Sequence, residues 1–239
     1  MFDQAQWVCL VCGYNMVGEM PEVCPFCGAR HDSFLTWEET ERRFRVTSSR
    51  VNDSVTQLLS VPRLGLEHAA YRIETGGEAV WIDCPSAFNR DLAPVEAIYF
   101  THRDFMGASN QYRQAWGAEV AIHARDAAHP LARPFPVDRR FEAGFHDGEL
   151  EAIPIGGHTP GFTVYIFREV LFVCDFAFPP GPEMRLNPYS TTEMRAKAED
   201  LKALLAHRAE GLEIVCGYNY VAPFEAWRSD FERMLAREG

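Results

Sequence analysis

The sequence has no hydrophobic run long enough to span a membrane, and it has few basic residues compared with acidic ones. Its 239 residues include 23 Lys and Arg against 34 Asp and Glu, which gives a formal net charge of −11. A transmembrane helix needs about 20 consecutive apolar residues, and no stretch approaches that length. An acidic chain is a poor partner for nucleic acid or for an anionic membrane surface. We therefore expect neither nucleic acid nor a membrane as a partner.

Several other signatures are missing. The first ten residues, MFDQAQWVCL, contain no basic segment followed by an apolar one, so we find no export signal and expect a cytoplasmic protein. There is no internal repeat, no low-complexity tract and no glycine-rich loop of the kind that cradles nucleotides. Hydrophobic residues make up 47% and charged residues 24%, which is typical of a soluble globular protein with a core. The length allows one ordinary domain plus a small module.

Cysteine is concentrated near the N-terminus. Four of the seven cysteines follow the spacing C-x2-C-x11-C-x2-C: Cys9, Cys12, Cys24 and Cys27. Without an export signal, two such pairs indicate a tetrahedral metal site rather than disulfides, because each tight turn directs two sulfurs at one point. A segment this short buries too little apolar surface to fold alone, so metal binding would supply its folding free energy.

The surroundings of these cysteines resemble rubredoxin, and the short spacer is similar to the rubredoxin module of rubrerythrins. Residues 7–34 read WVCLVCGYNMVGEMPEVCPFCGARHDSF. The resemblance implies a one-electron Fe(III)/Fe(II) carrier, and zinc remains the alternative because the same four ligands bind both metals. We expect this metal-knuckle domain to span residues 1–40. The aromatic residues expected to shield the centre from water are Trp7, Tyr14, Phe26, Phe34 and Trp37.

The expected knuckle domain is also acidic. Residues 1–40 hold six Asp and Glu residues against the single basic residue Arg30. An acidic face could steer a basic redox partner protein, and a surface kept soluble by its charge is the simpler interpretation.

From residue 41 onwards the pattern predicts short strands followed by strands alternating with helices. A helix is expected from a capping box at Ser190–Glu193 to about residue 208, and a final helix carries an apolar stripe that includes Trp227 and Phe231. Residues 35–45 are expected to be a charged connector. The predicted strands are 54–61, 69–75, 79–84, 97–102, 118–123, 150–155, 162–167, 170–175 and 212–217.

Polar motifs follow several of these strands. Thr101-His102-Arg103-Asp104 follows one strand, and His158 lies in the loop GGHTPG after another. Asp175 and Tyr218 come at the ends of two further strands. Because side chains at the ends of adjacent strands can converge, and because imidazole and carboxylate groups suit a transition metal, we expect one site at this edge.

The order of these motifs resembles the metallo-β-lactamase superfamily over residues 45–239. The resemblance implies an α/β fold in which an αββα sandwich carries metal ligands along one edge of its two sheets. The expected architecture is therefore a metallo-β-lactamase sandwich, residues 41–239, preceded by the small rubredoxin-like metal-knuckle domain.

The ligand set departs from the family motif THxHxDH, because the chain reads THRDFMGA and lacks the middle histidine. Asp104 takes the role of the motif's aspartate, Phe105 replaces its last histidine, and Tyr218 stands at the C-terminal histidine position. The candidate catalytic residues are His102, Asp104, His158, Asp175 and Tyr218. The first four are also candidate ligands for a single iron or zinc ion. A pocket without metal, in which the histidines pair with the aspartates, is the alternative.

The remaining cysteines, Cys84, Cys174 and Cys216, each close a predicted strand. We expect them to be small buried residues, with soft metal ligands or redox thiols as the alternative. His68 and His123 also lie near strand ends and could line the mouth of the site, but neither is among its candidate residues.

Three functions follow from these observations. A redox protein, in which the iron centre exchanges electrons with a metal, thiol or bound flavin in the sandwich, is preferred because a hydrolase gains nothing from a redox-capable centre. A hydrolase with one metal ion and a non-catalytic binding module with a structural zinc knuckle are the alternatives. Both enzyme functions imply a small-molecule substrate, and the family resemblance implies a possible homodimer.

Overall fold

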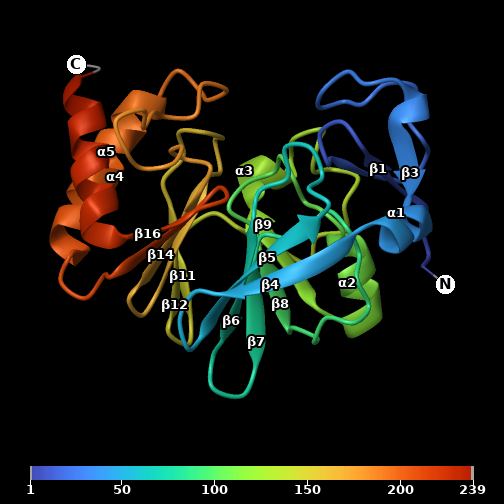
Figure 1. Cartoon of the computed structure of the whole chain (residues 1–239), viewed down its shortest axis with the longest axis horizontal. Coiled ribbons are helices and arrows are strands. Elements are labelled where there is room, and N and C mark those ends of the chain that lie inside the picture. Colours follow the sequence, from blue (N-terminus) through green and yellow to red (C-terminus); the bar gives the residue numbers. More distant parts are fainter. Residues whose placement is uncertain (1, 238–239) are drawn as a thin grey trace. The chain divides into compact units, whose positions relative to one another are not determined.

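The computed structural model describes residues 2–237, which form two compact units divided between Arg140 and Phe141. Each unit contains its own large sheet (Figure 1). Residues on both sides of position 40 belong to the first unit, so the domain boundary expected there stays a prediction.

The first unit begins with a three-stranded antiparallel sheet in the order β2-β1-β3. Its strands are β1 (Gln6–Cys9), β2 (Asn15–Val17) and β3 (Phe34–Thr36), with a 3-10 turn at His31–Ser33. Helix α1 (Trp37–Arg43) follows directly, and a capping box formed by Thr36 and Glu39 begins it. The expectation of a charged connector over 35–45 is therefore wrong: this capping box, Thr-x-x-Glu, starts a helix in the middle of the segment.

The large sheet of the first unit has seven strands in the order β10-β9-β8-β7-β6-β5-β4. Strands β7, β8 and β9 are parallel, whereas β4 to β7 are antiparallel neighbours. The positive φ of 93° at Gly76 provides the β6–β7 hairpin turn that the sequence predicts. The strand bounds are β4 Arg45–Arg50, β5 Val55–Val61, β6 Ala70–Glu74, β7 Ala79–Ile82, β8 Ala97–Tyr99, β9 Glu119–His123 and β10 Arg139–Phe141.

Strands β7 and β8 are buried along their whole length and belong to the core of the first unit. The Trp81 ring meets the Tyr112 ring of helix α2 (Ser109–Trp116) edge-on, at 4.8 Å between centroids. A short helix α3 (Ala124–Ala127) follows β9. Sequence periodicity did not indicate α2, because its buried face is largely polar, with Ser109, Asn110 and Gln111.

The second unit has a six-stranded sheet in the order β11-β12-β13-β14-β15-β16. All pairs are antiparallel except β14 with β15. Helices α4 (Met194–Arg208) and α5 (Phe224–Arg237) lie beside this sheet (Figure 1). The strand bounds are β11 Phe145–Asp147, β12 Leu150–Pro154, β13 Thr163–Phe167, β14 Val170–Cys174, β15 Ile214–Gly217 and β16 Val221–Pro223.

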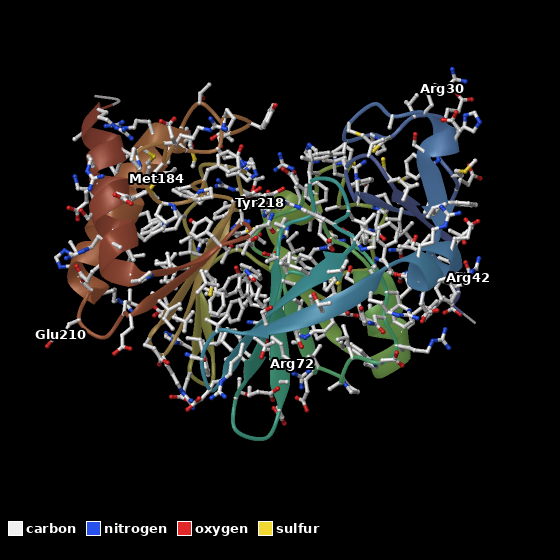
Figure 2. All side chains as sticks on the ribbon, in the orientation of Figure 1. Arg30, Arg42, Arg72, Met184, Glu210 and Tyr218 are labelled. Atoms are coloured by element: carbon white, nitrogen blue, oxygen red, sulfur yellow. The ribbon has the colours of Figure 1, made fainter. Side chains whose placement is uncertain are left out.

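The apolar stripe predicted for the final helix, α5, packs in the core of the second unit, together with buried residues of α4 and of the sheet. Trp227 and Phe231 stack at 4.7 Å, and Leu201 and Leu205 join the same cluster. Met184, labelled in Figure 2, is buried in this cluster. None of the helices in the described part of the chain has the length and apolarity that a membrane crossing requires.

The capping box predicted at Ser190–Glu193 is wrong, although the helix does end at Arg208. Helix α4 begins with Met194 after the N-cap residue Glu193, which makes no side-chain cap. The Ser190 hydroxyl donates to the Asn187 carbonyl instead, at 2.6 Å, and the Thr191 hydroxyl donates to the Gly157 carbonyl at 2.6 Å. A local partner of Ser190 and a tertiary partner of Thr191 have therefore engaged the hydroxyls that could have capped the helix.

Candidate metal sites

The four N-terminal cysteines lie in two similar turns. The Gly13 N–H donates to the Cys9 carbonyl at 2.7 Å, and the Gly28 N–H donates to the Cys24 carbonyl at 2.9 Å. Both glycines have positive φ, 86° and 75°, a conformation that other residues rarely adopt. The two turns therefore direct two pairs of sulfurs toward one point.

The spacing of the four sulfurs fits a tetrahedral metal ion. Cys9 Sγ lies 3.8 Å from Cys27 Sγ, and Cys12 Sγ lies 3.7 Å from Cys24 Sγ. All four sulfurs lie within 4.8 Å of one another. A tetrahedron with metal–sulfur bonds of about 2.3 Å has edges of about 3.8 Å, whereas a disulfide would bring two sulfurs to about 2.05 Å. The four-cysteine site is therefore a metal-binding site, with the ligands that the sequence predicts.

The thiols influence one another strongly. Hydrogen bonds from the Cys12 and Cys24 thiols lower the pKa of Cys9 to about 3. The pKa of Cys12 is raised, because its thiol hydrogen-bonds to Cys24 and Cys9 and it is buried. The Cys9 thiolate therefore forms easily, whereas ionisation of Cys12 is opposed, and a bound cation would favour the thiolate form of Cys12.

An apolar cluster surrounds the four-cysteine site, and sulfur atoms gather in the N-terminal segment (Figure 2). Four of the five predicted aromatic residues, Trp7, Tyr14, Phe26 and Phe34, belong to it. Trp37 does not, because its ring packs against Phe2 and Phe88 at 4.7 and 6.0 Å.

Phe105 takes a place in this cluster, with its ring 4.7 Å from Phe26. Phe105, which the family resemblance places at the position of a family histidine, therefore packs in the cysteine cluster.

Backbone and side-chain hydrogen bonds attach the knuckle to the rest of the first unit. The Tyr14 hydroxyl donates to the Leu131 carbonyl at 2.8 Å. The Leu66 N–H donates to the Cys12 carbonyl at 2.9 Å. Burial and the neighbouring cysteines raise the pKa of Tyr14, so its hydroxyl stays protonated and keeps donating. The four-cysteine site is therefore held against the large sheet of its own unit.

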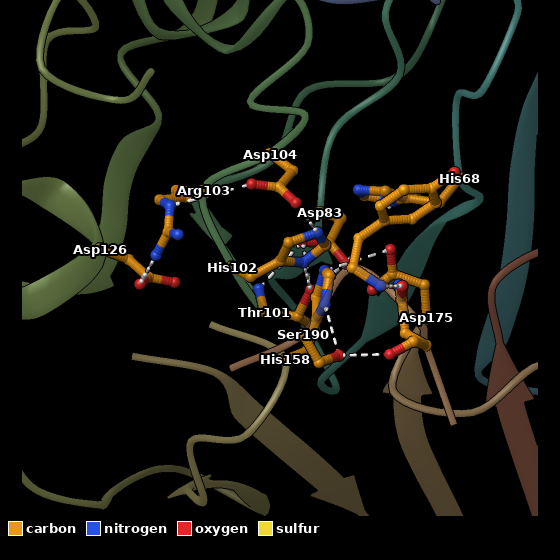
Figure 3. A network of polar contacts seen from close by, with 12 residues as sticks. His68, Asp83, Thr101, His102, Arg103, Asp104, Asp126, His158, Asp175 and Ser190 are labelled. Atoms are coloured by element: carbon orange, nitrogen blue, oxygen red, sulfur yellow. Dashed lines mark hydrogen bonds and ion pairs between the residues drawn. The ribbon is translucent and has the colours of Figure 1, made fainter. Parts of the chain in front are cut away.

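A second polar cluster lies at one edge of that sheet, where the parallel strands β7 and β8 end. Asp83 follows β7, and Thr101 and His102 follow β8. The Thr101 hydroxyl lies 2.8 Å from Asp83 Oδ2 and 2.9 Å from His102 Nδ1 (Figure 3). The Thr101 N–H also donates to Asp83 Oδ1 at 2.9 Å. Adjacent strand ends have brought these groups together, as the sequence predicts for His102.

These contacts determine which nitrogen of His102 carries the hydrogen. The Thr101 hydroxyl has one proton, which it donates to the Asp83 carboxylate, so it accepts from His102 Nδ1–H. The lone pair of His102 is then on Nε2, the atom that faces Asp104 Oδ2 at 4.0 Å. A carboxylate acting through a second group on Nδ1 is the usual support of a metal-binding histidine.

Asp104 is also close to a guanidinium group. Arg103 Nε lies 3.9 Å from Asp104 Oδ1, and Arg103 Nη1 pairs with the buried Asp126 at 2.9 Å. Asp126 therefore holds the guanidinium beside Asp104 (Figure 3).

His158 and Asp175 come together in the second unit. The loop before β13 carries His158, and Asp175 follows β14, so the antiparallel pairing brings both to one edge. Ser190 Oγ accepts from His158 Nδ1–H at 3.2 Å because its own proton goes to Asn187. His158 Nε2 then faces Asp175 Oδ2 at 3.6 Å. Both histidines predicted as ligands thus turn Nε2 toward a carboxylate.

Tyr218 follows β15 at the same edge of the second sheet, and its ring meets Phe178 edge-on at 6.1 Å. Nearby, the Tyr220 hydroxyl donates to the Ala177 carbonyl at 3.0 Å and accepts from Trp227 Nε1 at 2.9 Å. A catalytic role of Tyr218 stays a prediction.

The three other cysteines are buried. Burial raises the pKa of the Cys84 and Cys216 thiols, which disfavours reactive thiolates there. Cys174 ends β14, whereas the strand before Cys84 ends earlier, at Ile82, and Cys216 lies inside β15.

The structure therefore forms a His102–Asp104 pair in the first unit and a His158–Asp175 pair in the second. Convergence of the two pairs on one metal ion stays a prediction. The sequence analysis did not identify Asp83 as a site residue, although it is the one acidic residue of the predicted strand 79–84. His68 was also not among the candidate site residues. It lies just before β6, and the antiparallel pairing of β6 with β7 brings it opposite the end of β7.

Comparison with known proteins supports both parts of the architecture. Residues 7–35 match the family described as "Rubrerythrin, rubredoxin-like domain". No protein of curated function matches the sequence significantly.

Solved metallo-β-lactamase structures resemble most of the chain. The DIM-1 enzyme is 13% identical with a TM-score of 0.63, covering 82% of this chain and 100% of its own. The enzyme from Hirschia baltica is 18% identical with a TM-score of 0.62, covering 80% and 97%. FIM-1 from Pseudomonas aeruginosa, in its mono-zinc form, is 16% identical with a TM-score of 0.61, covering 81% and 96%.

These findings confirm the expected fold class. The protein has a metallo-β-lactamase fold together with an N-terminal rubredoxin-like domain, and the four-cysteine site binds a metal. At such low identities the likeness to metallo-β-lactamases concerns the fold.

Proposed function

We propose that the protein is an iron-binding redox protein in which the four-cysteine centre exchanges electrons with the metallo-β-lactamase-fold part. The observation that carries the proposal is the set of four sulfurs at tetrahedral spacing inside a rubredoxin-like segment. An iron ion held there would supply one-electron exchange between its ferric and ferrous states.

Residues around the sulfurs support a redox role. The Tyr14 N–H points at Cys12 Sγ, 3.4 Å away. An N–H directed at a thiolate stabilises the more negative, reduced centre and therefore raises its reduction potential. Phe26 and Phe105 pack in the apolar cluster with the three buried cysteines of the site, whereas Cys27 is exposed. This packing limits the water around three of the four sulfurs and thereby the reorganisation that accompanies each change of charge.

The route toward the sheet edge is short within the first unit. Phe105 contacts Phe26 on one side and the His68 ring on the other, at centroid distances of 4.7 and 5.7 Å. A single aromatic side chain therefore separates the cysteine cluster from the histidines of the strand ends. Electron transfer weakens steeply with distance, so this arrangement favours exchange between the two places.

In this proposal the strand-end residues hold a single iron or zinc ion. The four ligand candidates are His102, Asp104, His158 and Asp175, Tyr218 is a further candidate catalytic residue, and a small-molecule substrate would react at this ion. The acidic knuckle would receive or deliver electrons through a redox partner protein.

The test is metal analysis with a visible spectrum of anaerobically purified protein. We expect stoichiometric iron and a red colour that bleaches with dithionite and returns in air. Cys24→Ser should abolish the colour, whereas Cys84→Ser, at a buried cysteine outside the site, should keep it. Colourless protein that contains stoichiometric zinc would refute the redox proposal.

A hydrolase with one metal ion is the second candidate. It is favoured by the hydroxyl contacts at Nδ1 of His102 and His158, because a hydrogen-bond partner on one ring nitrogen is the usual support of a metal-binding histidine. A bound ion lowers the pKa of a coordinated water, and a carboxylate such as Asp175 could orient that water. His158→Ala should then abolish ester or thioester hydrolysis together with binding of the second metal, and hydrolysis that survives in this variant excludes the mechanism.

A further inference from the structure

One loop of the first unit, residues 62–69 between β5 and β6, lies against both the cysteine cluster and the strand-end histidines. At one point the Leu66 N–H donates to the Cys12 carbonyl at 2.9 Å. Two residues later, the His68 ring lies 5.2 Å from the His102 ring. We call this segment the linking loop.

The linking loop is firmly anchored. Between the two contacts, Glu67 Oε1 accepts hydrogen bonds from the Ser60 hydroxyl at 2.8 Å and from the Ser86 N–H at 2.5 Å. Gly65 packs so closely on the knuckle that an added Cβ would lie 2.3 Å from the Val11 carbonyl oxygen. The contacts of Gly65 and Glu67 therefore fix the loop backbone on both sides of position 66 and so determine where His68 lies.

The groups around His68 indicate which of its ring nitrogens carries the hydrogen. Nδ1 lies 3.3 Å from the Ala69 carbonyl oxygen and 3.9 Å from Asp83 Oδ2, and both of these atoms are acceptors. Nδ1 therefore carries the hydrogen, and Nε2 carries the lone pair. Among the described residues Nε2 has no hydrogen-bond partner, although the side chain is only 1% exposed. Burying such an atom without a partner is unfavourable, which points to a ligand at this place.

His68 and His102 share one supporting carboxylate. Asp83 Oδ2 lies 3.9 Å from His68 Nδ1, close enough for an electrostatic interaction, and Asp83 reaches His102 Nδ1 through the Thr101 hydroxyl. Ligand nitrogens of the two rings lie within 4.8 Å of each other. Two imidazoles whose Nδ1 atoms lie near the same carboxylate, and whose ligand nitrogens lie this close together, form the arrangement expected of paired metal ligands.

We propose that His68 is a ligand, together with His102, for a single transition-metal ion of the Fe(II), Zn(II) or Co(II) class. The linking loop thereby supplies an imidazole in place of the histidine that the motif THRDFMGA lacks. Asp104, whose Oδ2 lies 4.0 Å from His102 Nε2, is the carboxylate that adds an oxygen ligand. The inference rests on the second metal site of the proposed function, and it identifies a ligand that the family motif does not contain.

Zinc binding to protein whose four-cysteine centre is already filled tests the assignment. Metal analysis and competition with a chromophoric chelator give the stoichiometry and the dissociation constant of the second ion. We expect wild-type protein to bind one further zinc ion. His68→Gln should weaken that binding by more than about 100-fold, because even a group that only supports a ligand contributes 10–100-fold. His207→Gln, on the exposed face of α4, should bind zinc like the wild type.

Binding of the second ion at wild-type affinity by His68→Gln overturns the assignment, and so does wild-type protein that takes up no second ion. If His68→Gln does not fold, nitrogen NMR of histidine-labelled wild-type protein with zinc in both sites replaces it. The expected result is a metal-bound shift at His68 Nε2 with Nδ1 still protonated, and an unchanged Nε2 resonance overturns the proposal.

These readouts are independent of colour. Protein that proves colourless refutes the iron redox function but leaves the histidine ligand testable, because the zinc experiments do not require iron.

Discussion

The backbone N–H of Leu66 donates a 2.9 Å hydrogen bond to the carbonyl oxygen of Cys12. This bond joins a metal ligand of the knuckle to the loop that carries His68. Next to it, Gly65 has a φ of +49°, and a Cβ at this position would lie 2.6 Å from Cys12 Cα. The backbone of the loop and the backbone of the knuckle touch here, with no room for a side chain.

Gly65→Ala should therefore destabilise the protein. The new methyl group must push apart two backbones in a conformation that alanine disfavours, so we expect a loss of at least about 2 kcal/mol in the free energy of unfolding. Gly77→Ala is the control, since an added Cβ there meets nothing within 4 Å. Its effect should stay within about 1 kcal/mol. Chemical denaturation measures both, and equal effects would show that the contact between loop and knuckle does not constrain the fold.

Phe105→Ala should expose the four-cysteine centre. Phe105 is 4% exposed and packs on Phe26, so its truncation should destabilise the protein by about 3–5 kcal/mol and admit water to the cluster. We expect iron to be lost to a chelator at least several-fold faster than from wild type, as followed by the visible absorbance.

The matched control is Phe88→Ala, because Phe88 is equally buried at 4% but packs against Tyr112 and Trp37. This variant should lose similar stability while releasing iron at nearly the wild-type rate under native conditions. Similar acceleration in both variants would attribute iron release to global unfolding and would contradict a specific shielding role for Phe105.

Asp83→Asn should weaken binding of the second metal ion without changing the backbone. Asp83 has a φ of 60°, which asparagine also tolerates. The amide removes the charge that supports the Nδ1 protons of both His68 and His102, so we expect zinc affinity at this site to fall by about 10–100-fold. Competition titration measures the change. Asp138→Asn, at an aspartate that pairs with Arg113 elsewhere in the same unit, should retain wild-type affinity.

The pairing of Glu41 with Arg90 should make stability depend on pH in acid. Both guanidinium contacts are 2.7 Å long, and the hydrogen bonds from Arg90 lower the pKa of the Glu41 carboxyl. A carboxyl whose pKa is lower in the folded state stabilises the fold above its unfolded pKa of about 4.3. That contribution disappears as the pH falls through the folded-state pKa.

Glu41→Gln should therefore be less stable than wild type at pH 7, by up to about 1 kcal/mol because Arg90 is largely exposed. The difference should vanish when unfolding is repeated at a pH below the folded-state pKa. Asp53→Asn, at an exposed pair with Arg50, is expected to change little at either pH. A wild-type advantage that persists unchanged into strong acid would contradict an electrostatic origin.

Local chemistry allowed much of this protein to be predicted from its sequence. The four cysteines lie within 19 consecutive positions, and turns of two intervening residues leave little freedom in where the sulfurs point. The apolar runs predicted buried strands, and His102, His158 and Asp175 could therefore be placed at the ends of these strands. The pairing of His102 with Asp104, two residues apart, and the core stripe of α5 were likewise local consequences of sequence.

Other features were decided only by tertiary structure. Ser190 lies four positions before α4 yet supports His158 instead of capping the helix, because its hydroxyl donates to a local carbonyl and accepts from this distant histidine. Trp37 joined another aromatic group, and Phe105 joined the cysteine cluster, according to which surfaces the packed chain brought together. His68 met His102, 34 positions away, only because β6 pairs antiparallel with β7 while β8 runs parallel to it. Such contacts depend on strand order and register, which no single segment of the sequence encodes.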